Sequence, residues 1–371
     1  MKPVRVAIAD DSAFIRKALV RILEADPRIA VVGTATCGEE LLDHLADWSP
    51  DVISLDLSMP GIGGLRTLDR IMERQPTPVI ILSTHARESA PLTIEALHRG
   101  AVDFIDKQRY SLVDFQTLSR ILIKRILEIA GREEGLAPGF ATERSAAPAA
   151  SEAVPPAPQT SLAVAERSAA YDVLILAAST GGPMAIQTVL ESLPSPPPAP
   201  VVVIQHMPPD FTGAFADRLN NHLPFAVRHA ADGELLLAGT AYVAPGGHQL
   251  QLVRTASGLA LRVSEDSMGR GHSPSADITF TSAAEVLGAK VLAAILTGMG
   301  RDGADGLAKL TALGAHAIAQ DRKSSIVFGM PKAAIARGGV AEVLPLAKIG
   351  PRLSQLLAEG GSDPETDPNG S

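Results

Sequence analysis

The sequence predicts two α/β domains, each built on a mainly parallel, doubly wound sheet. Residues 1–131 alternate five short apolar runs with five amphipathic runs of helical period, an order typical of a parallel sheet with helices on both faces. Residues 132–170 are rich in Ala, Pro, Ser and Glu without apolar periodicity, which indicates a flexible linker. Residues 171–359 resume the alternation, and residues 360–371 are expected to form a disordered tail.

In the N-terminal domain, the apolar runs predict five parallel strands. These are VRVAIAD, IAVVGTA, DVISLDL, PVIILST and AVDFID, at residues 4–10, 29–35, 51–57, 78–84 and 101–106. The predicted helices span residues 12–25, 38–48, 63–75, 88–100 and 112–131. Because each crossover between parallel strands returns the chain to the same side, the carboxyl ends of the strands meet at one edge.

The C-terminal domain opens with a buried strand that runs directly into a helix. YDVLILAA, residues 171–178, has the continuous apolar character of a strand, and PMAIQTVLESL, residues 183–193, has helical spacing with proline at its first position. Further along, HQLQLVRTASGLALRVSED, residues 248–266, predicts a β-hairpin that turns at TASG. We therefore expect a mainly parallel sheet with one added hairpin.

Composition excludes several classes of function. A net charge of −8 and a pI near 5.6 argue against general nucleic-acid binding, which depends on clustered Lys and Arg. The one cysteine, Cys37, excludes an intrachain disulfide and a Cys-rich zinc site, and we expect it to be a small core residue. No apolar run approaches the length of a membrane span, and the first residues do not resemble a signal peptide. A cytoplasmic location without membrane insertion is expected.

Three carboxylates in the N-terminal domain fall at strand ends. Asp10 and Asp11 end the first predicted strand and Asp56 ends the third. Like charges at one edge repel unless a cation intervenes, and oxygen ligands of this kind suit Mg²⁺. Asp56 is then a candidate nucleophile, because a carboxylate accepts a phosphoryl group as an acyl phosphate. Taken singly, each aspartate also fits a helix cap or a turn.

A hydroxyl and an ammonium complete this edge, since Ser83 ends the fourth predicted strand and Lys107 closely follows the fifth. The blocks IADDSAFIR, DVISLDLSMPGIGGL, VIILST and GAVDFIDK together resemble those of response-regulator receiver domains. The resemblance implies the following roles: Asp56 as phosphoacceptor; Asp10, Asp11 and Asp56 as Mg²⁺ ligands; Ser83 as switch hydroxyl; Phe104 as switch aromatic; and Lys107 as a contact to the phosphate.

The stretch ILAASTGGP places Ser179 at the carboxyl end of the strand at 171–178, where open α/β sheets bind ligands. It fits a nucleophilic serine, a phosphate-binding loop or a Ser/Thr helix cap. The P-loop pattern G-x-x-x-x-G-K-[ST] is absent. A nucleophilic serine would need a histidine base and a carboxylate that orients it.

His206 is the best-placed base, because it follows the β-rich run VVVIQ and so reaches the same sheet edge as Ser179. His248, in a glycine-containing loop, competes with it, whereas His222 is expected on an exposed helix face. Asp302 follows a further buried run and is the candidate carboxylate, with a helix cap as the alternative. Backbone amides of TGMG, residues 297–300, are positioned to stabilise an oxyanion.

Six blocks of this domain resemble the catalytic domain of the protein-glutamate methylesterases of bacterial chemotaxis. They are AASTGGP, IQHMPPDFT, YVAPGGHQL, SADITFTSAA, ILTGMGRDGADGL and QDRKSSIVFGMPKAAI. The resemblance implies that Ser179 is the nucleophile, His206 the general base and Asp302 the carboxylate that orients the base. It also implies that the backbone amide of Met299 contributes to the oxyanion hole.

The two resemblances together imply a phosphorylation-activated hydrolase of two-component signalling. It would demethylate glutamate methyl esters on chemoreceptors with release of methanol, and deamidate receptor glutamines, without a cofactor for the ester chemistry. A histidine kinase would be the phosphodonor, methylated chemoreceptors the substrate, and a monomer the expected state. The unphosphorylated receiver is hypothesised to cover the esterase cleft. The alternative is a non-enzymatic, phosphorylation-dependent regulator whose second domain is a binding module.

Overall fold

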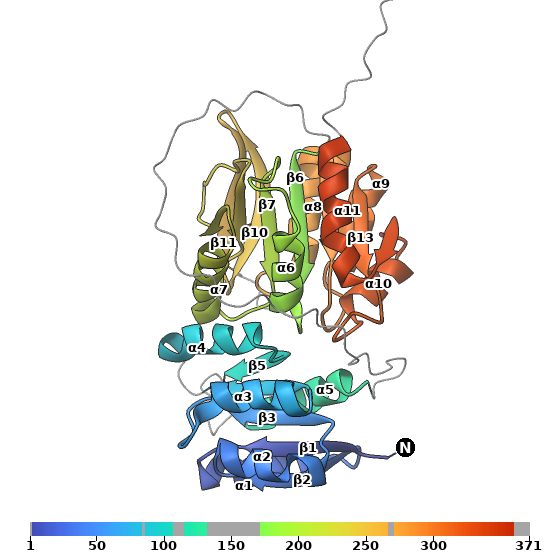
Figure 1. Ribbon diagram of the computed structural model, residues 1–371. Helices are drawn as coiled ribbons and strands as arrows, with labels where there is room; N and C mark the ends of the chain where they lie inside the picture. Colours follow the sequence, from blue (N-terminus) through green and yellow to red (C-terminus); the bar gives the residue numbers. More distant parts are fainter. Residues whose placement is uncertain (1, 84–85, 107–114, 132–170, 266–270, 360–371) are drawn as a thin grey trace, which may run out of the picture.

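The computed structural model describes residues 2–83, 86–106, 115–131, 171–265 and 271–359 (Figure 1). It contains two parallel sheets and one antiparallel hairpin, so the predicted fold class is confirmed. The linker and the tail predicted at 132–170 and 360–371 lie outside the described residues. In the part of the chain that is described, no helix is both long and apolar enough to cross a membrane.

The N-terminal sheet has five parallel strands in the order β2-β1-β3-β4-β5. The strands are β1 (Val4–Ala9), β2 (Ile29–Ala35), β3 (Val52–Asp56), β4 (Val79–Ser83) and β5 (Asp103–Asp106). The helices are α1 (Ala13–Glu24), α2 (Gly38–Trp48), α3 (Gly63–Arg74), α4 (Ala86–His98) and α5 (Phe115–Ile129). All five predicted strands are present, because each is a short apolar run bounded by polar or turn residues.

Helices cover both faces of this sheet. Leu19 of α1 and Leu122 of α5 share a buried cluster with Ile8, whereas Leu41 of α2 and Leu68 of α3 belong to another buried cluster. Since successive strand residues point to opposite faces, an apolar run without alternation fills both layers. The acidic strand ends are thereby left at the edge of a rigid sheet.

The C-terminal sheet has seven strands, all paired in parallel, in the order β14-β13-β12-β6-β7-β9-β8. They are β6 (Val173–Ala178), β7 (Val201–Gln205), β8 (Ala226–His229), β9 (Thr240–Val243), β12 (Val291–Ile295), β13 (His316–Gln320) and β14 (Glu342–Leu344). The predicted hairpin is confirmed as β10 (His248–Thr255) and β11 (Gly258–Glu265), with Thr255 opposite Gly258 at the turn.

Two helical layers enclose this sheet. The helices are α6 (Gly182–Glu191), α7 (Pro209–His222), α8 (Ala276–Leu287), α9 (Ala304–Ala312), α10 (Met330–Ala336) and α11 (Leu346–Glu359), with the short 3-10 helix η1 (Gly288–Lys290). Along β6, Leu174 and Leu176 pack in one layer with Ile186 of α6, while Ile175 packs in the other with Phe280 of α8. The central strand β6 is therefore buried on both faces.

The two domains are stacked end to end (Figure 1). α4 and β5 of the N-terminal domain lie against the end of the C-terminal domain formed by α7 and α6. A single buried cluster runs across this contact and includes Leu97 and Phe104 from one domain and Met207 and Phe211 from the other. The carboxyl edge of the central strands in the second sheet is consequently next to the first domain.

Candidate active site and phosphorylation site

Ser179 directly follows β6, and α6 begins three residues later. Its backbone amide donates to the carbonyl of Thr297, at 3.0 Å. Gly181 has a φ of +75°, a left-handed conformation that side chains other than glycine rarely adopt. At Gly182 a Cβ atom would fall 2.0 Å from Oε1 of Gln205. The two glycines therefore allow the sharp turn that holds Ser179 at the strand end.

The register of β6 on β7 brings His206 beside Ser179. Ala178 is the partner of Gln205, so the next residue on each strand is Ser179 and His206 respectively. The backbone amide of His206 donates to the carbonyl of Ala178, at 3.1 Å. Because neighbouring parallel strands lie about 4.8 Å apart, this register fixes the two side chains at one edge.

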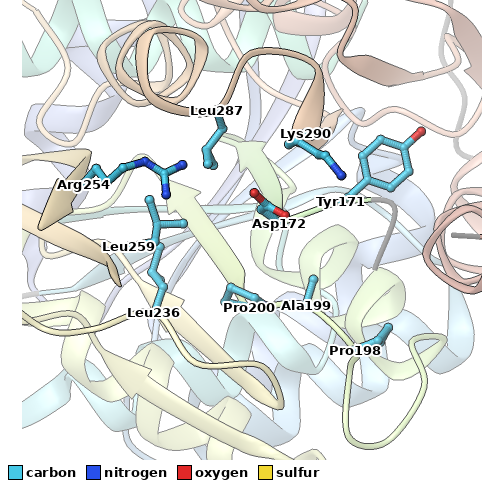
Figure 2. Close-up of a pocket in the computed structure, with 10 residues that line it drawn as sticks. All are labelled: Tyr171, Asp172, Pro198, Ala199, Pro200, Leu236, Arg254, Leu259, Leu287 and Lys290. Atoms are coloured by element: carbon cyan, nitrogen blue, oxygen red, sulfur yellow. The ribbon is translucent and has the colours of Figure 1, made fainter. Parts of the chain in front are cut away.

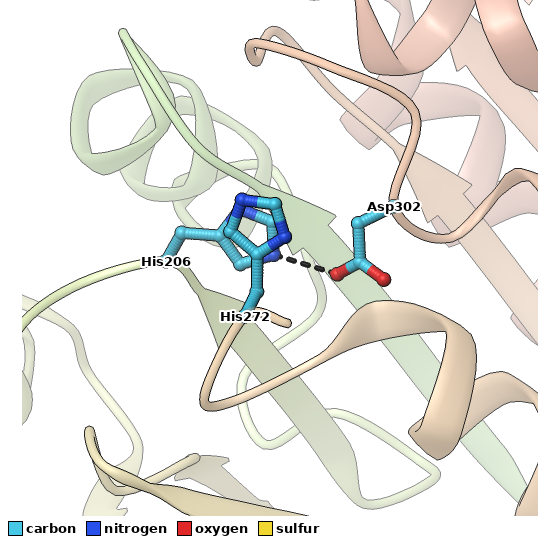
Figure 3. A group of neighbouring side chains, drawn as sticks. All are labelled: His206, His272 and Asp302. Carbon is cyan, nitrogen blue, oxygen red and sulfur yellow. Dashed lines mark hydrogen bonds and ion pairs between the residues drawn. The ribbon is translucent and has the colours of Figure 1, made fainter. Parts of the chain in front are cut away.

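Asp302 accepts a hydrogen bond from Nε2 of His206, at 2.7 Å, and both side chains are only 8% exposed (Figure 3). The carboxylate also accepts from Oγ of Ser275, at 2.8 Å, and from the backbone amide of Ala276, at 2.7 Å. Burial alone would raise the pKa of Asp302. The hydrogen bonds from His206, Ser275 and Ala276 outweigh burial and hold that pKa well below its usual range. Asp302 is therefore an ionised, buried acceptor.

The other nitrogen of His206 is oriented away from Asp302. Nδ1 is buried and has no hydrogen-bond partner among the described residues. An ionised carboxylate can only accept a hydrogen bond, so Nε2 must be the donor. In the neutral ring the proton therefore lies on Nε2 and the lone pair on Nδ1. Nδ1 is therefore the atom available to take a proton.

The competing histidines are not part of this arrangement. His222 is paired with Glu191, at 2.7 Å, at the end of α7. Nδ1 of His248 lies 3.1 Å from the carbonyl of Gly246 at the start of β10. Of the three histidines considered from the sequence, the structure brings His206 alone to Asp302.

The loop that contains Met299 lies against Ser179. A Cβ atom at Gly298 would fall 2.9 Å from Cβ of Ser179 and 2.4 Å from Sδ of Met330, so only glycine fits at this position. The backbone amide of Gly298 is occupied by the carbonyl of Val327, at 3.0 Å. The amide of the next residue, Met299, stays the predicted donor to the oxyanion.

In the N-terminal domain, carboxylate oxygens of Asp10, Asp11 and Asp56 lie within 4.8 Å of one another. Asp10 and Asp56 are buried and Asp11 is exposed. The backbone amides of Ser12 and Ser58 donate to Asp10 and Asp56, at 3.0 and 2.9 Å. Three carboxylates this close form an oxygen donor set that fits a hard divalent cation such as Mg²⁺.

Two further residues singled out by the receiver resemblance, Ser83 and Phe104, lie in the expected strands. Ser83 ends β4, and its Oγ lies 2.6 Å from Oγ of Ser89 in α4. Phe104 lies in β5 and is buried. Lys107 lies outside the described residues.

Comparison with known proteins decides the family. Residues 174–353 match the CheB methylesterase family and residues 6–130 match the response regulator receiver domain. Three protein-glutamate methylesterase/protein-glutamine glutaminases are similar over nearly their whole length. That of Koribacter versatilis is 40% identical, covering 93% of both chains; one from Myxococcus xanthus is 41% identical, covering 95% of this chain and 97% of its own; and one from Pseudomonas aeruginosa is 38% identical, covering 97% and 99%.

The chain belongs to the CheB family of protein-glutamate methylesterase/protein-glutamine glutaminases. It is an enzyme of chemotaxis adaptation in which a receiver domain regulates a methylesterase domain. The alternative of a non-enzymatic second domain is thereby set aside. The predicted class of enzyme is confirmed, whereas the roles of individual residues stay predictions.

The receiver contacts the loop that contains Ser179. Oγ1 of Thr180 donates to the carboxylate of Asp103 in β5, at 2.8 Å, and the amide of Gly181 donates to the carbonyl of Val102, at 2.9 Å. Asp103 is in turn paired with Arg125 of α5, at 2.9 Å. Thr180 and Gly181, directly after Ser179, are therefore hydrogen-bonded to the receiver.

The receiver also contacts α7, the helix that follows His206. The rings of Phe104 and Phe211 are tilted against each other, with centroids 4.4 Å apart. Further out, Arg218 of α7 pairs with Glu95 of α4, at 2.5 Å. Sequence reasoning missed these contacts, because nothing in the pattern of one domain specifies which residue of the other it meets.

His272 is the residue at the site that sequence reasoning passed over. Its ring is stacked on that of His206, with centroids 4.0 Å apart and 5° between the planes (Figure 3). Burial, and next the neighbouring His206, lower the pKa of His272. No sequence pattern marked it, because His272 lies in the irregular segment before α8 and not at the end of a strand.

His206 and His272 line a pocket of about 440 Å³ between the two domains. Its walls are formed by Asp103, Phe104, Ile105, Asp106 and Arg125 of the receiver and by His206, Met207, Pro208, Gly247, Gly271, His272 and Ser273 of the methylesterase domain. The candidate base is thus enclosed partly by receiver residues.

A second pocket, of about 360 Å³, lies at the opposite end of the sheet (Figure 2). It includes Asp172, Pro200 and Lys290, which directly precede β6, β7 and β12. It is therefore at the amino ends of these strands, remote from the edge that holds Ser179.

Proposed function

We propose that Ser179, His206 and Asp302 form the catalytic triad of this methylesterase. The observation that carries the proposal is the hydrogen bond from Nε2 of His206 to Asp302, which leaves Nδ1 as a lone-pair acceptor at the edge shared with Ser179. A serine hydroxyl is a weak nucleophile unless a base within reach takes its proton. The ionised Asp302 fixes the required tautomer and stabilises the imidazolium that forms.

In the proposed reaction, Oγ of Ser179 attacks the carbonyl carbon of a γ-glutamyl methyl ester while Nδ1 of His206 takes the hydroxyl proton. The amide of Met299 donates to the oxyanion, a contact of a kind that contributes roughly 3 kcal/mol to transition-state stabilisation. Collapse of the tetrahedral intermediate breaks the bond to methoxide, which leaves as methanol with the proton from His206. Water then cleaves the acyl-enzyme by the same steps and releases glutamate. With a glutamine substrate, ammonia leaves instead.

The receiver is proposed to be phosphorylated on Asp56, with Mg²⁺ held by Asp10, Asp11 and Asp56. When bound, the cation would neutralise the charge of the carboxylates and of the phosphoryl group. Ser83 and Lys107 are proposed to contact the phosphoryl oxygens. A histidine kinase as phosphodonor, methylated chemoreceptors as substrate and a cytoplasmic location complete the proposal.

The unphosphorylated receiver is proposed to restrain the active site. Support comes from its contacts with Thr180, next to the proposed nucleophile, and from its part in the pocket that contains His206. Phosphorylation would act through Phe104, the expected switch aromatic, which packs on Phe211 of α7. A shift of Phe104 would then loosen the contact between α7 and the receiver.

The test is methanol release from methylated receptor membranes, with and without Mg²⁺ and acetyl phosphate. Ser179→Ala should lower release by about six powers of ten, that is, below detection, because removal of a triad nucleophile costs about that much. Asp56→Asn should retain basal release and lose the stimulation by acetyl phosphate. Ser192→Ala, at the end of α6, is the control and should behave as the parent.

A fluorophosphonate probe supplies an independent readout. It should label the parent on Ser179 and leave Ser179→Ala unlabelled, with faster labelling in the presence of acetyl phosphate. Undiminished methanol release from Ser179→Ala would show that the nucleophile is wrong. Stimulation that persists in Asp56→Asn would show that the phosphoacceptor is wrong.

A further inference from the structure

We propose that His206, His272 and Asp302 form an inhibitory site for a transition-metal ion of the Zn²⁺ class. One nitrogen from each histidine and one oxygen of the aspartate all lie within 4.8 Å of one another. The proposal rests on the role proposed above for His206. It assigns a role as metal ligand to His272, which the triad mechanism does not use.

The donor set selects the metal. Two imidazoles and one carboxylate, with a fourth position open to water, are a typical Zn²⁺ set, whereas Mg²⁺ and Ca²⁺ prefer oxygen ligands alone. His272 supplies a second imidazole nitrogen beside that of His206, and a neutral imidazole coordinates through its nitrogen lone pair. Asp302 is ionised and supplies the compensating charge.

The geometry requires a small adjustment. Nε2 of His206 and Oδ2 of Asp302 are 2.7 Å apart, and an ion in place of the shared proton would move them slightly apart, because Zn²⁺ binds each ligand at about 2.0–2.2 Å. The stacked ring of His272 must tilt, since a metal lies in the plane of each imidazole that binds it. His272 is exposed, and its ring forms no hydrogen bond to a described residue that would oppose the tilt. The adjoining pocket of about 440 Å³ has room for the water that completes the coordination.

Inhibition follows from the tautomer. A metal bound to the Nε2 lone pair of His206 requires the ring proton to lie on Nδ1, so the proton moves from one nitrogen to the other without net gain or loss. Nδ1 would then be a donor and unable to take the proton of Ser179. Coordination would also divert Asp302 from its hydrogen bond with His206. One bound ion therefore prevents His206 from taking the serine proton and removes the hydrogen bond by which Asp302 orients it.

The experiment titrates Zn²⁺ into the intact chain, with saturating Mg²⁺ to occupy the acidic cluster of the receiver and without phosphodonor. Cys37→Ser serves as the background, so that no thiol competes for the metal. Methanol release should fall with added Zn²⁺ and return with EDTA. His272→Ala should raise the half-inhibiting Zn²⁺ concentration tenfold or more relative to its own uninhibited rate, because loss of a metal contact costs at least this factor. His44→Ala, an exposed receiver histidine stacked on Trp48, is the matched control and should leave it unchanged.

Metal binding is measured separately in the Ser179→Ala variant, which retains the three donors. Co²⁺ should give the visible absorption of a four-coordinate site at one equivalent, and His272→Ala in the same variant should remove it. These spectra do not depend on turnover, so a failure of the proposed nucleophile would leave this result standing. Unchanged Zn²⁺ sensitivity in His272→Ala, absence of the Co²⁺ spectrum, or Zn²⁺ binding at the three donors without inhibition would each overturn the proposal.

Discussion

Asp302 links the chemistry of the site to the stability of the domain. Its carboxylate accepts from His206, which follows β7, and from Ser275 and Ala276 at the start of α8. The helix-cap alternative considered from the sequence is therefore partly right, but the helix concerned is α8 rather than the α9 that follows Asp302 in the chain. Sequence could not reveal this, because the cap and the capped helix are separated by some 25 residues and meet only through the fold.

Replacement of Asp302 should therefore affect activity and stability together. In Asp302→Asn we expect a fall in kcat of about four powers of ten, because the amide favours the wrong tautomer of His206. The free energy of unfolding of the methylesterase domain should also fall by about 1–3 kcal/mol, because buried donors lose a charged acceptor. Urea denaturation measures this fall. Ser275→Ala removes one donor and keeps the charge, so it should cost about 1 kcal/mol and change kcat far less. A fully stable Asp302→Asn enzyme would contradict the capping role.

The pH dependence of stability isolates the same carboxylate. The pKa of Asp302 is lowered in the folded protein, whereas in the unfolded chain it is near 3.9. A lowered folded pKa gives stability that is fully present above about pH 4 and is lost as the pH falls toward the folded value. The stability difference between the parent and Asp302→Asn should hence be constant above pH 5 and shrink below pH 4. Urea denaturation at a series of pH values measures it, and a difference that grows on acidification would contradict this assignment.

At the scale of elements, strand ends explain why the residues of the proposed triad could be expected at one edge of the sheet. Ser179, His206 and the loop that holds Met299 each follow a fully buried strand, β6, β7 or β12, and such strands are visible as unbroken apolar runs. Parallel pairing then places the three strand ends together whatever the helices do. The contact of His272 with this edge could not be predicted, because it depends on the path of an irregular segment that has no periodicity.

The contact between α4 and α7 offers a test of the proposed restraint by the receiver. Arg218 and Glu95 are about one-third and one-quarter exposed, so their ion pair contributes at most about 1 kcal/mol. Arg218→Ala should accordingly raise basal methanol release up to about fivefold, since 1 kcal/mol changes an equilibrium by that factor. Release in the presence of acetyl phosphate should change little. Arg228→Ala breaks an ion pair with Glu234 inside the methylesterase domain and is the control. Basal release that is unchanged or lower in Arg218→Ala would contradict restraint by this contact.

For the whole molecule, both sites lie at strand carboxyl ends, yet the domains meet through different surfaces. The methylesterase domain presents the edge with Ser179 to the contact, whereas the receiver presents β5 and α4. Both folds could be predicted from apolar periodicity, which is a local property of the chain. Their relative placement could not, because it depends on contacts such as Phe104 with Phe211, more than a hundred residues apart in sequence.

If one closed-to-open equilibrium connects the domains, the two sites must influence each other equally. A ligand that favours the open form at one site raises the affinity of the other site by the same factor, by thermodynamic linkage. Beryllofluoride with Mg²⁺, which mimics a phosphoryl group on Asp56, and a reversible boronic acid, which forms a tetrahedral adduct with a nucleophilic serine, are the ligands that test this.

We expect beryllofluoride to tighten boronic acid binding, and a saturating boronic acid to tighten beryllofluoride binding, by equal factors between about 5 and 150, the usual range of coupling between sites. Calorimetric titration of each ligand with and without the other measures both factors on the intact chain. Asp56→Asn and Ser179→Ala are the matched controls. Asp56→Asn should not bind beryllofluoride, so adding it should leave boronic acid affinity unchanged. Ser179→Ala should not bind the boronic acid, so adding it should leave beryllofluoride affinity unchanged. Affinities that are each independent of the other ligand would show that phosphorylation does not act by opening the contact between β5 and the Ser179 loop.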